Sequence, residues 1–132
     1  MIFVDTSYWV ALRNRLDAHH QPAAALLSRH AGTTLLTTNH VRGEAWTYLR
    51  RKGGHRAAVA FLDVMEQSPR VSLVRVPARL ESRAMKWLRR HDEREYSFVD
   101  ATSFALMRSL RMQEAFAFDG DFSAAGFTEL RP

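Results

Sequence analysis

The chain has 132 residues, of which 46% are hydrophobic, so it is long enough for one compact domain over residues 1–132 and too short for two. It contains no cysteine, which excludes disulfides and thiolate metal sites, and no apolar run approaches the roughly 18 residues of a membrane span. We therefore expect a cytoplasmic protein in which any metal is held by carboxylates, histidines or water.

The net charge is +5, and only two of the 19 basic residues, Lys52 and Lys86, are lysines. Arginine binds phosphate with two parallel hydrogen bonds and stacks on bases, so this balance favours a nucleic-acid partner. A GC-rich genome, which replaces lysine by arginine throughout a proteome, explains the same composition. Charge alone leaves both interpretations open.

Short apolar runs alternate along the chain with segments of helical spacing. Five runs predict strands, at residues 2–4, 34–37, 71–76, 115–118 and 127–130. Six segments predict helices, at residues 6–12, 17–30, 41–52, 55–66, 78–91 and 98–110. This alternation predicts an α/β fold with a mostly parallel sheet covered on both faces. In such sheets ligands bind beyond the carboxyl ends of the strands.

Two carboxylates follow predicted strands directly. Asp5 ends the first apolar run, and Asp119 ends the run that begins at Ala115. Both side chains are therefore expected at the carboxyl edge of the sheet, in one crevice. Each also has a purely structural interpretation, because Asp5 can cap the following helix and Asp119-Gly120 can form an ordinary turn.

Glu44 is an acid on a helix face that is otherwise apolar. The spacing places it within the stripe formed by Val41, Ala45, Tyr48 and Leu49. A carboxylate that faces the protein needs a partner, and a structural ion pair with Arg42 or Arg75 is the alternative to a functional role.

Asp100 lies in the first turn of the last long predicted helix. It shares a face with Phe104 and Met107 and is therefore expected to point inward. The helix macrodipole favours an acid at this position in any case, so a structural role is again possible.

Four inward-facing acids with no lysine near them in the sequence call for a cation. Clustered carboxylates repel one another, and hard oxygen ligands without sulfur select Mg²⁺, with Mn²⁺ as a possible substitute. Such a site suits hydrolysis of a phosphodiester. With two metals all four acids share the coordination, and with one metal a spare carboxylate orients or deprotonates the water.

Four stretches of the chain resemble the motifs of a known family: MIFVDTSYW, NHVRGEAW, YSFVDATSFALM and AFAFDGDFSAAGF. In this order they are similar to the amino-terminal Asp-Thr/Ser motif, the internal glutamate helix, the third-acid motif and the carboxyl-terminal Asp-x-Asp-Phe motif of PIN-domain ribonucleases. The similarity is greatest to the VapC toxins of bacterial toxin–antitoxin pairs. It spans residues 1 to about 127, in family order and spacing.

The resemblance implies a role for each matched position. The metal-binding and catalytic quartet is Asp5, Glu44, Asp100 and Asp119. Asp121 matches a position that varies in the family, where it either contacts a second metal or stabilises the turn. Thr6 matches the hydroxyl residue beside the first acid, so we assign it to substrate binding, and Phe122 is expected to pack in the core.

The resemblance also implies a fold and an activity. The fold is a three-layer α/β/α sandwich around a four- or five-stranded parallel sheet, and the protein is a homodimer. The activity is that of a Mg²⁺-dependent endoribonuclease inhibited by a VapB antitoxin. Family substrates are structured RNAs, either tRNA or the sarcin–ricin loop of large-subunit ribosomal RNA. The stretches HDEREYSFVDATSFA and FDGDFSAAGF resemble the branch that cuts ribosomal RNA.

Other aromatic and basic residues carry weaker signals. His19 matches no common metal-ligand spacing and is expected to face solvent. Trp9 and Trp46 flank the first two acids and either stack on an unpaired base or pack in the core or a dimer interface. The run Arg50-Arg51-Lys52 complements the carbonyls at a helix end, with RNA contact as its second possible use.

Two other function classes compete with the nuclease. The first is a non-catalytic PIN-like module that binds RNA or a protein. The second is a haloacid-type phosphohydrolase, which lacks support because Thr6-Ser7 follows Asp5 where that class needs an Asp-x-Asp nucleophile motif.

Overall fold

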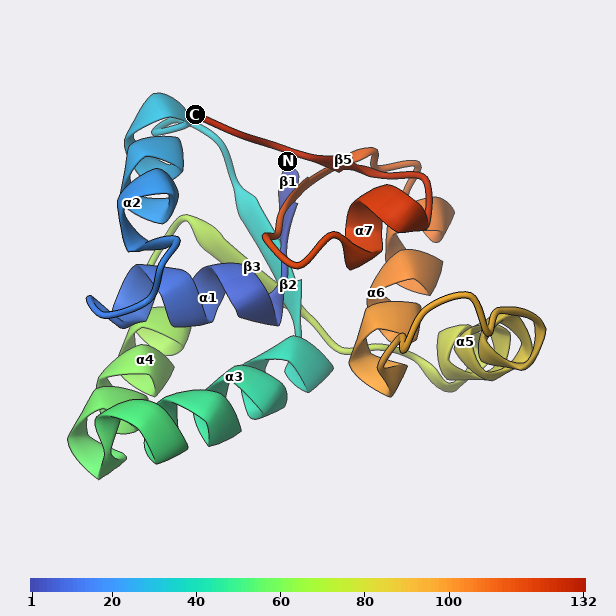
Figure 1. Cartoon of the computed structure of the whole chain (residues 1–132), viewed down its shortest axis with the longest axis horizontal. Helices are drawn as coiled ribbons and strands as arrows, with labels where there is room; N and C mark the ends of the chain where they lie inside the picture. The colour runs from blue at the N-terminus through green and yellow to red at the C-terminus, as the bar shows by residue number, and fades with distance from the viewer.

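The computed structural model describes all residues, 1–132, and contains a five-stranded sheet with seven helices (Figure 1). The strands are β1 (Ile2–Val4), β2 (Leu35–Thr38), β3 (Val71–Val74), β4 (Glu114–Phe116) and β5 (Thr128–Glu129). The helices are α1 (Thr6–Arg13), α2 (His20–Arg29), α3 (Asn39–Gly53), α4 (His55–Gln67), α5 (Ala78–Arg90), α6 (Phe98–Ser109) and α7 (Asp121–Ala124).

The sheet is entirely parallel, with strand order β3-β2-β1-β4-β5. Strands β2 and β3 lie on one side of β1, in that order. Strands β4 and β5 come later in the chain and lie on the other side of β1. The strand order therefore reverses between β1 and β4, and this is where parallel sheets open a crevice for ligands. Asp5 and Asp119 follow these two strands.

Helices cover both faces of the sheet, as the sandwich prediction requires (Figure 1). Helices α1 to α4, drawn from blue to green, lie on one side, and α5 to α7, drawn from yellow to red, lie on the other. Two helix pairs, α3 with α4 and α5 with α6, make the most extensive packing contacts. None of the helices combines the length and apolar composition needed to cross a lipid bilayer.

The central strand, β1, is apolar because both of its faces are covered. Phe3 is fully buried and stacks on Phe122, which packs in the core as predicted. Trp9 of α1 is also buried, and its indole N–H donates to the Thr37 hydroxyl, which in turn donates to the Val4 carbonyl. These bonds satisfy polar groups at the carboxyl end of β1 and fix the start of α1 against the sheet.

The element boundaries differ from the sequence predictions in specific places. The strand predicted over residues 115–118 ends at Phe116, because the Phe118 N–H leaves the sheet and donates to the Ser7 hydroxyl. The strand predicted over residues 71–76 ends at Val74, and the helix predicted from residue 17 begins at His20. Helix α7 was not predicted, because four residues are too few to display helical periodicity.

Candidate active site

Three carboxylates that are far apart in the sequence meet at the carboxyl edge of the sheet. One oxygen from each of Asp5, Asp100 and Asp119 lies within 4.8 Å of the other two. Asp5 lies at the tip of β1, Asp119 follows β4, and Asp100 projects from the first turn of α6. The strand-order reversal brings the first two together, and packing of α6 against the sheet supplies the third.

Asp5 carries out a structural role with one oxygen and leaves the other free. Its Oδ2 accepts hydrogen bonds from the Ser7 backbone N–H at 3.2 Å and from the Ser7 hydroxyl at 2.7 Å, which caps α1. Its Oδ1 is buried and has no hydrogen-bond partner. The helix-cap interpretation is thus correct for one oxygen, and the second oxygen is a buried acceptor that lacks a donor.

Asp100 and Asp119 follow the same pattern. Asp100 Oδ2 accepts from the Ser97 N–H at 3.0 Å, in a capping box at the start of α6. Asp119 Oδ1 accepts from the Asp121 N–H at 3.2 Å in a tight turn. In each case the hydrogen bond uses a single carboxylate oxygen, so an oxygen remains for a ligand.

Burial and repulsion from neighbouring carboxylates raise the pKa values of all three acids. Burial raises the pKa of Asp5 well above its ordinary value, and the charges of Asp119 and Asp100 raise it further. Burial likewise raises the pKa of Asp100 to about 7, with added repulsion from Asp119. Desolvation raises the pKa of Asp119, the hydrogen bond from the Asp121 backbone N–H lowers it, and the charge of Asp121 raises it. None of the three side chains forms an ion pair.

This donor set fits a divalent cation. The three ligands are hard carboxylate oxygens that lie within 4.8 Å of one another, and the buried Oδ1 of Asp5 has no hydrogen-bond donor. A cation also removes the repulsion that raises the pKa values. Oxygen-only ligands favour Mg²⁺ or Mn²⁺ over softer metals.

Glu44 lies outside this group of three and lines the cavity that opens above it. The cavity has a volume of about 360 Å³ and is lined by Asp5, Thr6, Ser7, Val10, Asp17, His19, Glu44, Tyr48, Lys52, Phe118 and Asp119. Glu44 is half-buried and forms no ion pair, so the alternatives with Arg42 and Arg75 do not hold. The predicted apolar stripe was wrong for Tyr48, which is 46% exposed on the cavity side of α3.

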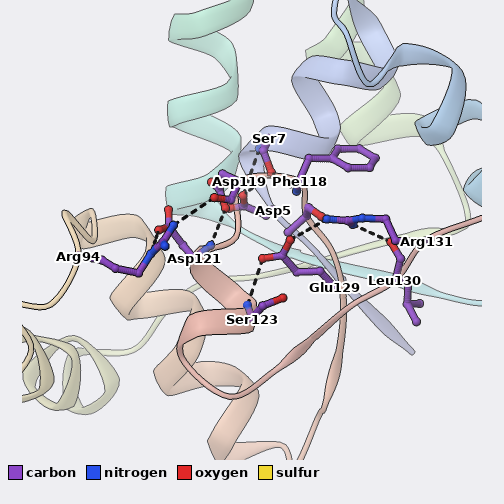
Figure 2. Close-up of polar contacts among 11 residues, drawn as sticks. Asp5, Ser7, Arg94, Phe118, Asp119, Asp121, Ser123, Glu129, Leu130 and Arg131 are labelled. Carbon is purple, nitrogen blue, oxygen red and sulfur yellow. Dashed lines mark hydrogen bonds and ion pairs between the residues drawn. The ribbon is translucent and has the colours of Figure 1, made fainter.

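Asp121 and Thr6 also lie beside the three acids. Arg94 Nε donates to Asp121 Oδ1 at 2.9 Å, and Arg94 Nη2 donates to the backbone carbonyl of Asp119 at 3.2 Å (Figure 2). Asp121 is therefore engaged by an arginine and stabilises the turn that holds Asp119. Thr6 lines the cavity, and its buried hydroxyl oxygen has no hydrogen-bond partner.

Sequence reasoning missed three residues of this site. Ser7 orients Asp5 (Figure 2), and the hydroxyl two positions after an Asp is a recognisable sequence signal for such a turn. Lys52 lines the cavity, contrary to the expectation that no lysine is near the acids. It follows Glu44 by two helical turns on the same face of α3. His19 also lines the cavity and stacks on Phe118, although nothing in the sequence links a loop residue to that strand end.

Comparison with known proteins supports this description. The family model described as "PIN domain" matches residues 2–128. Two curated proteins, each named "23S rRNA-specific endonuclease VapC20" and from two Mycobacterium tuberculosis strains (CDC 1551 / Oshkosh and ATCC 25618 / H37Rv), are 58% identical over 132 residues. The match covers 100% of this chain and 99% of each relative. A crystal structure of Mycobacterium tuberculosis VapC20, described as a "Sarcin-Ricin loop cleaving toxin", superposes with a TM-score of 0.95 at 56% identity and full coverage of both chains.

Proposed function

This chain belongs to the PIN-domain family, and from that premise we propose that it is a metal-dependent endoribonuclease of the VapC toxin class. The observation that carries the proposal is the meeting of Asp5, Asp100 and Asp119, together with a buried oxygen of Asp5 that has no hydrogen-bond partner. The degree of similarity to two 23S rRNA-specific endonucleases supports ribosomal RNA as the substrate and hydrolysis of a phosphodiester as the reaction. We propose the sarcin–ricin loop, the target named for the similar crystal structure, in preference to tRNA.

In the proposed mechanism the three aspartates hold Mg²⁺, with Mn²⁺ as a substitute. When bound, the cation supplies a Lewis acid that activates water and neutralises charge on the attacked phosphate. Ser7 fixes the rotamer of Asp5, and the Arg94–Asp121 pair fixes the turn that carries Asp119. Glu44, on the cavity wall, is placed to accept a proton from the attacking water or to share in coordination. Thr6 contributes a free hydroxyl that can contact the substrate phosphate.

The remaining partners follow from membership of the VapC class. We propose that a VapB-type antitoxin inhibits the protein. We also propose that residues 1–132 act as one domain. The protein would then function in the cytoplasm, where ribosomes are present. We further propose a homodimer, which light scattering of the purified protein tests directly. The exposed apolar side chains of Met85 and Leu110 are available to a second copy.

One experiment separates catalysis from RNA binding alone. Ribosomes and a sarcin–ricin hairpin are incubated with the protein and with its Asp5→Asn variant, in Mg²⁺ and in a chelator. We expect new RNA ends only with the parent protein in Mg²⁺. RNA binding without any new end, in Mg²⁺ and in Mn²⁺, would favour a non-catalytic module instead.

A further inference from the structure

The cavity above the carboxylates has an aromatic wall. The imidazole ring of His19 lies against the ring of Phe118, with centroids 4.7 Å apart and planes only 9° from parallel. The His19 side chain is 51% exposed, so Phe118 covers only part of the ring and the rest borders open space. A flat ligand in the cavity can therefore extend the stack.

The two stacked rings are held in place by separate contacts. The backbone N–H of His19 donates to Asp17 Oδ1 at 2.8 Å, which fixes the loop before α2. The Phe118 N–H donates to the Ser7 hydroxyl at 3.0 Å, and the guanidinium of Arg131 lies over the Phe118 ring at 5.1 Å (Figure 2). Because Ser7 also binds Asp5, the aromatic wall is tied directly to the carboxylates.

Helix α3 provides other lining residues of the cavity. Glu44, Tyr48 and Lys52 follow one another at four-residue intervals and line the cavity together. Lys52 is exposed and forms no salt bridge, so its ammonium is free to neutralise a ligand. The cavity thus offers three features that suit a nucleotide chain. The stacking surface suits a base, and the free cation suits a phosphate. The carboxylates suit a phosphate that is bound through a metal ion.

We propose that this cavity is the subsite for one unpaired nucleotide next to the cleaved bond. Its base stacks on His19, backed by Phe118, and its phosphate is neutralised by Lys52. The two aromatic residues that follow the first acid, Tyr8 and Trp9, cannot take this role because they are 0% and 1% exposed. The inference rests on the proposed ribonuclease function. It adds His19, Phe118 and Lys52 as the residues that bind the RNA beside the reacting atoms.

The test is steady-state cleavage of a sarcin–ricin hairpin by four variants of the full chain. His19→Ala removes the stacking ring, and His19→Phe keeps a ring without the imidazole. Lys52→Ala removes the free cation, and Lys86→Ala is the matched control, an exposed lysine on α5 that does not line the cavity. Thermal unfolding of each variant confirms that it is folded.

We expect His19→Ala to raise KM by about 5- to 100-fold with kcat changed less than about threefold, because stacking on one base accounts for an effect of this size. His19→Phe restores KM to within about threefold of the parent. Lys52→Ala raises KM and lowers the slope of log KM against log salt by about one, whereas Lys86→Ala changes neither.

Two failures are distinguishable. If the parent protein cleaves the hairpin but His19→Ala leaves KM unchanged, or His19→Phe is as defective as His19→Ala, the stacking subsite is overturned while the ribonuclease stands. If the parent cleaves no RNA in Mg²⁺ or Mn²⁺, the proposed function itself fails.

Discussion

The Ser7 hydroxyl donates to Asp5 Oδ2 at 2.7 Å and leaves Asp5 Oδ1 buried without a partner. The same hydroxyl accepts from the Phe118 N–H, so it joins the end of β1 to the segment that follows β4. Local hydrogen bonds thus use one oxygen of a carboxylate that lies beside Asp100 and Asp119, and they leave its other oxygen without a donor. A side chain that only capped a helix would have no reason to bury its second oxygen unpaired.

The variant Ser7→Ala tests this orientation. It removes one short hydrogen bond to Asp5 and the acceptor of the Phe118 N–H, so we expect a loss of about 1–3 kcal/mol in the free energy of unfolding. We also expect cleavage to fall by about tenfold or more, because Asp5 is then free to rotate. Urea denaturation and single-turnover cleavage measure the two effects. Ser109→Ala, which removes the hydroxyl of an exposed serine at the end of α6, should leave cleavage unchanged.

Metal-free protein should lose stability as the pH rises. The pKa of Asp100 is about 7 in the folded state and near 3.8 in an unfolded chain, so the folded protein retains a proton that the unfolded chain releases between these values. The stability from this group is complete below about pH 4 and is lost as the pH rises to about 7, a change of roughly 2 to 4 kcal/mol. Asp5 acts in the same direction.

Urea denaturation in chelator at pH 5 and pH 8 measures this effect. Asp100→Asn keeps an acceptor for the Ser97 N–H but removes the charge, so it should exceed the parent protein in stability at pH 8 and reduce the pH dependence. A parent protein that is equally stable at both pH values, or a variant with an undiminished pH dependence, would contradict the assignment.

Divalent cations should raise the melting temperature, and the shift should depend on the three clustered carboxylates. We expect Mn²⁺ and Mg²⁺ to stabilise the parent protein, with a larger shift at pH 8 than at pH 5 because bound carboxylates must be deprotonated. Asp5→Asn and Asp119→Asn should abolish the shift, whereas Glu44→Gln should keep much of it, since Glu44 lies outside the group of three. Differential scanning calorimetry measures these shifts. A Glu44→Gln variant as insensitive to metal as Asp5→Asn would place Glu44 among the primary ligands.

The Arg94–Asp121 ion pair should affect cleavage more than stability. Both side chains are partly exposed, so breaking the pair should cost less than about 1 kcal/mol in unfolding free energy. The turn that holds Asp119 loosens, however, so Arg94→Ala should slow cleavage several-fold. Calorimetric titration with Mn²⁺ distinguishes the two possible roles of Asp121. We expect Asp121→Asn to weaken metal binding far less than Asp119→Asn, and equal losses would make Asp121 a ligand.

Much of the fold was predictable because local and tertiary signals agree. The apolar runs that end at Val4 and Phe116 are buried on both faces, and parallel topology then brings the following acids, Asp5 and Asp119, to one edge. The helix spacing also predicted that Asp100 faces inward, and it is 5% exposed.

The cavity walls were not predictable in the same way. Tyr48 matched the apolar period of α3 yet lines the cavity, because the face of a helix is defined by what packs on it and not by spacing alone. His19 comes from a loop whose path depends on Asp17 and on the exit of the chain from β4, and neither leaves a periodic signal. His19 is therefore a position set by a loop, whereas Ser7, Tyr48 and Lys52 lie on helices whose spacing alone does not show what each face contacts.

The central claim is that Asp5, Asp100 and Asp119 share one divalent cation, and a crystal soaked in Mn²⁺ tests it most directly. Anomalous scattering should give a peak about 2.0–2.4 Å from an oxygen of each of the three carboxylates, including the unpartnered Oδ1 of Asp5. A protein that cleaves RNA in Mn²⁺ but places no metal between these three side chains would contradict the account.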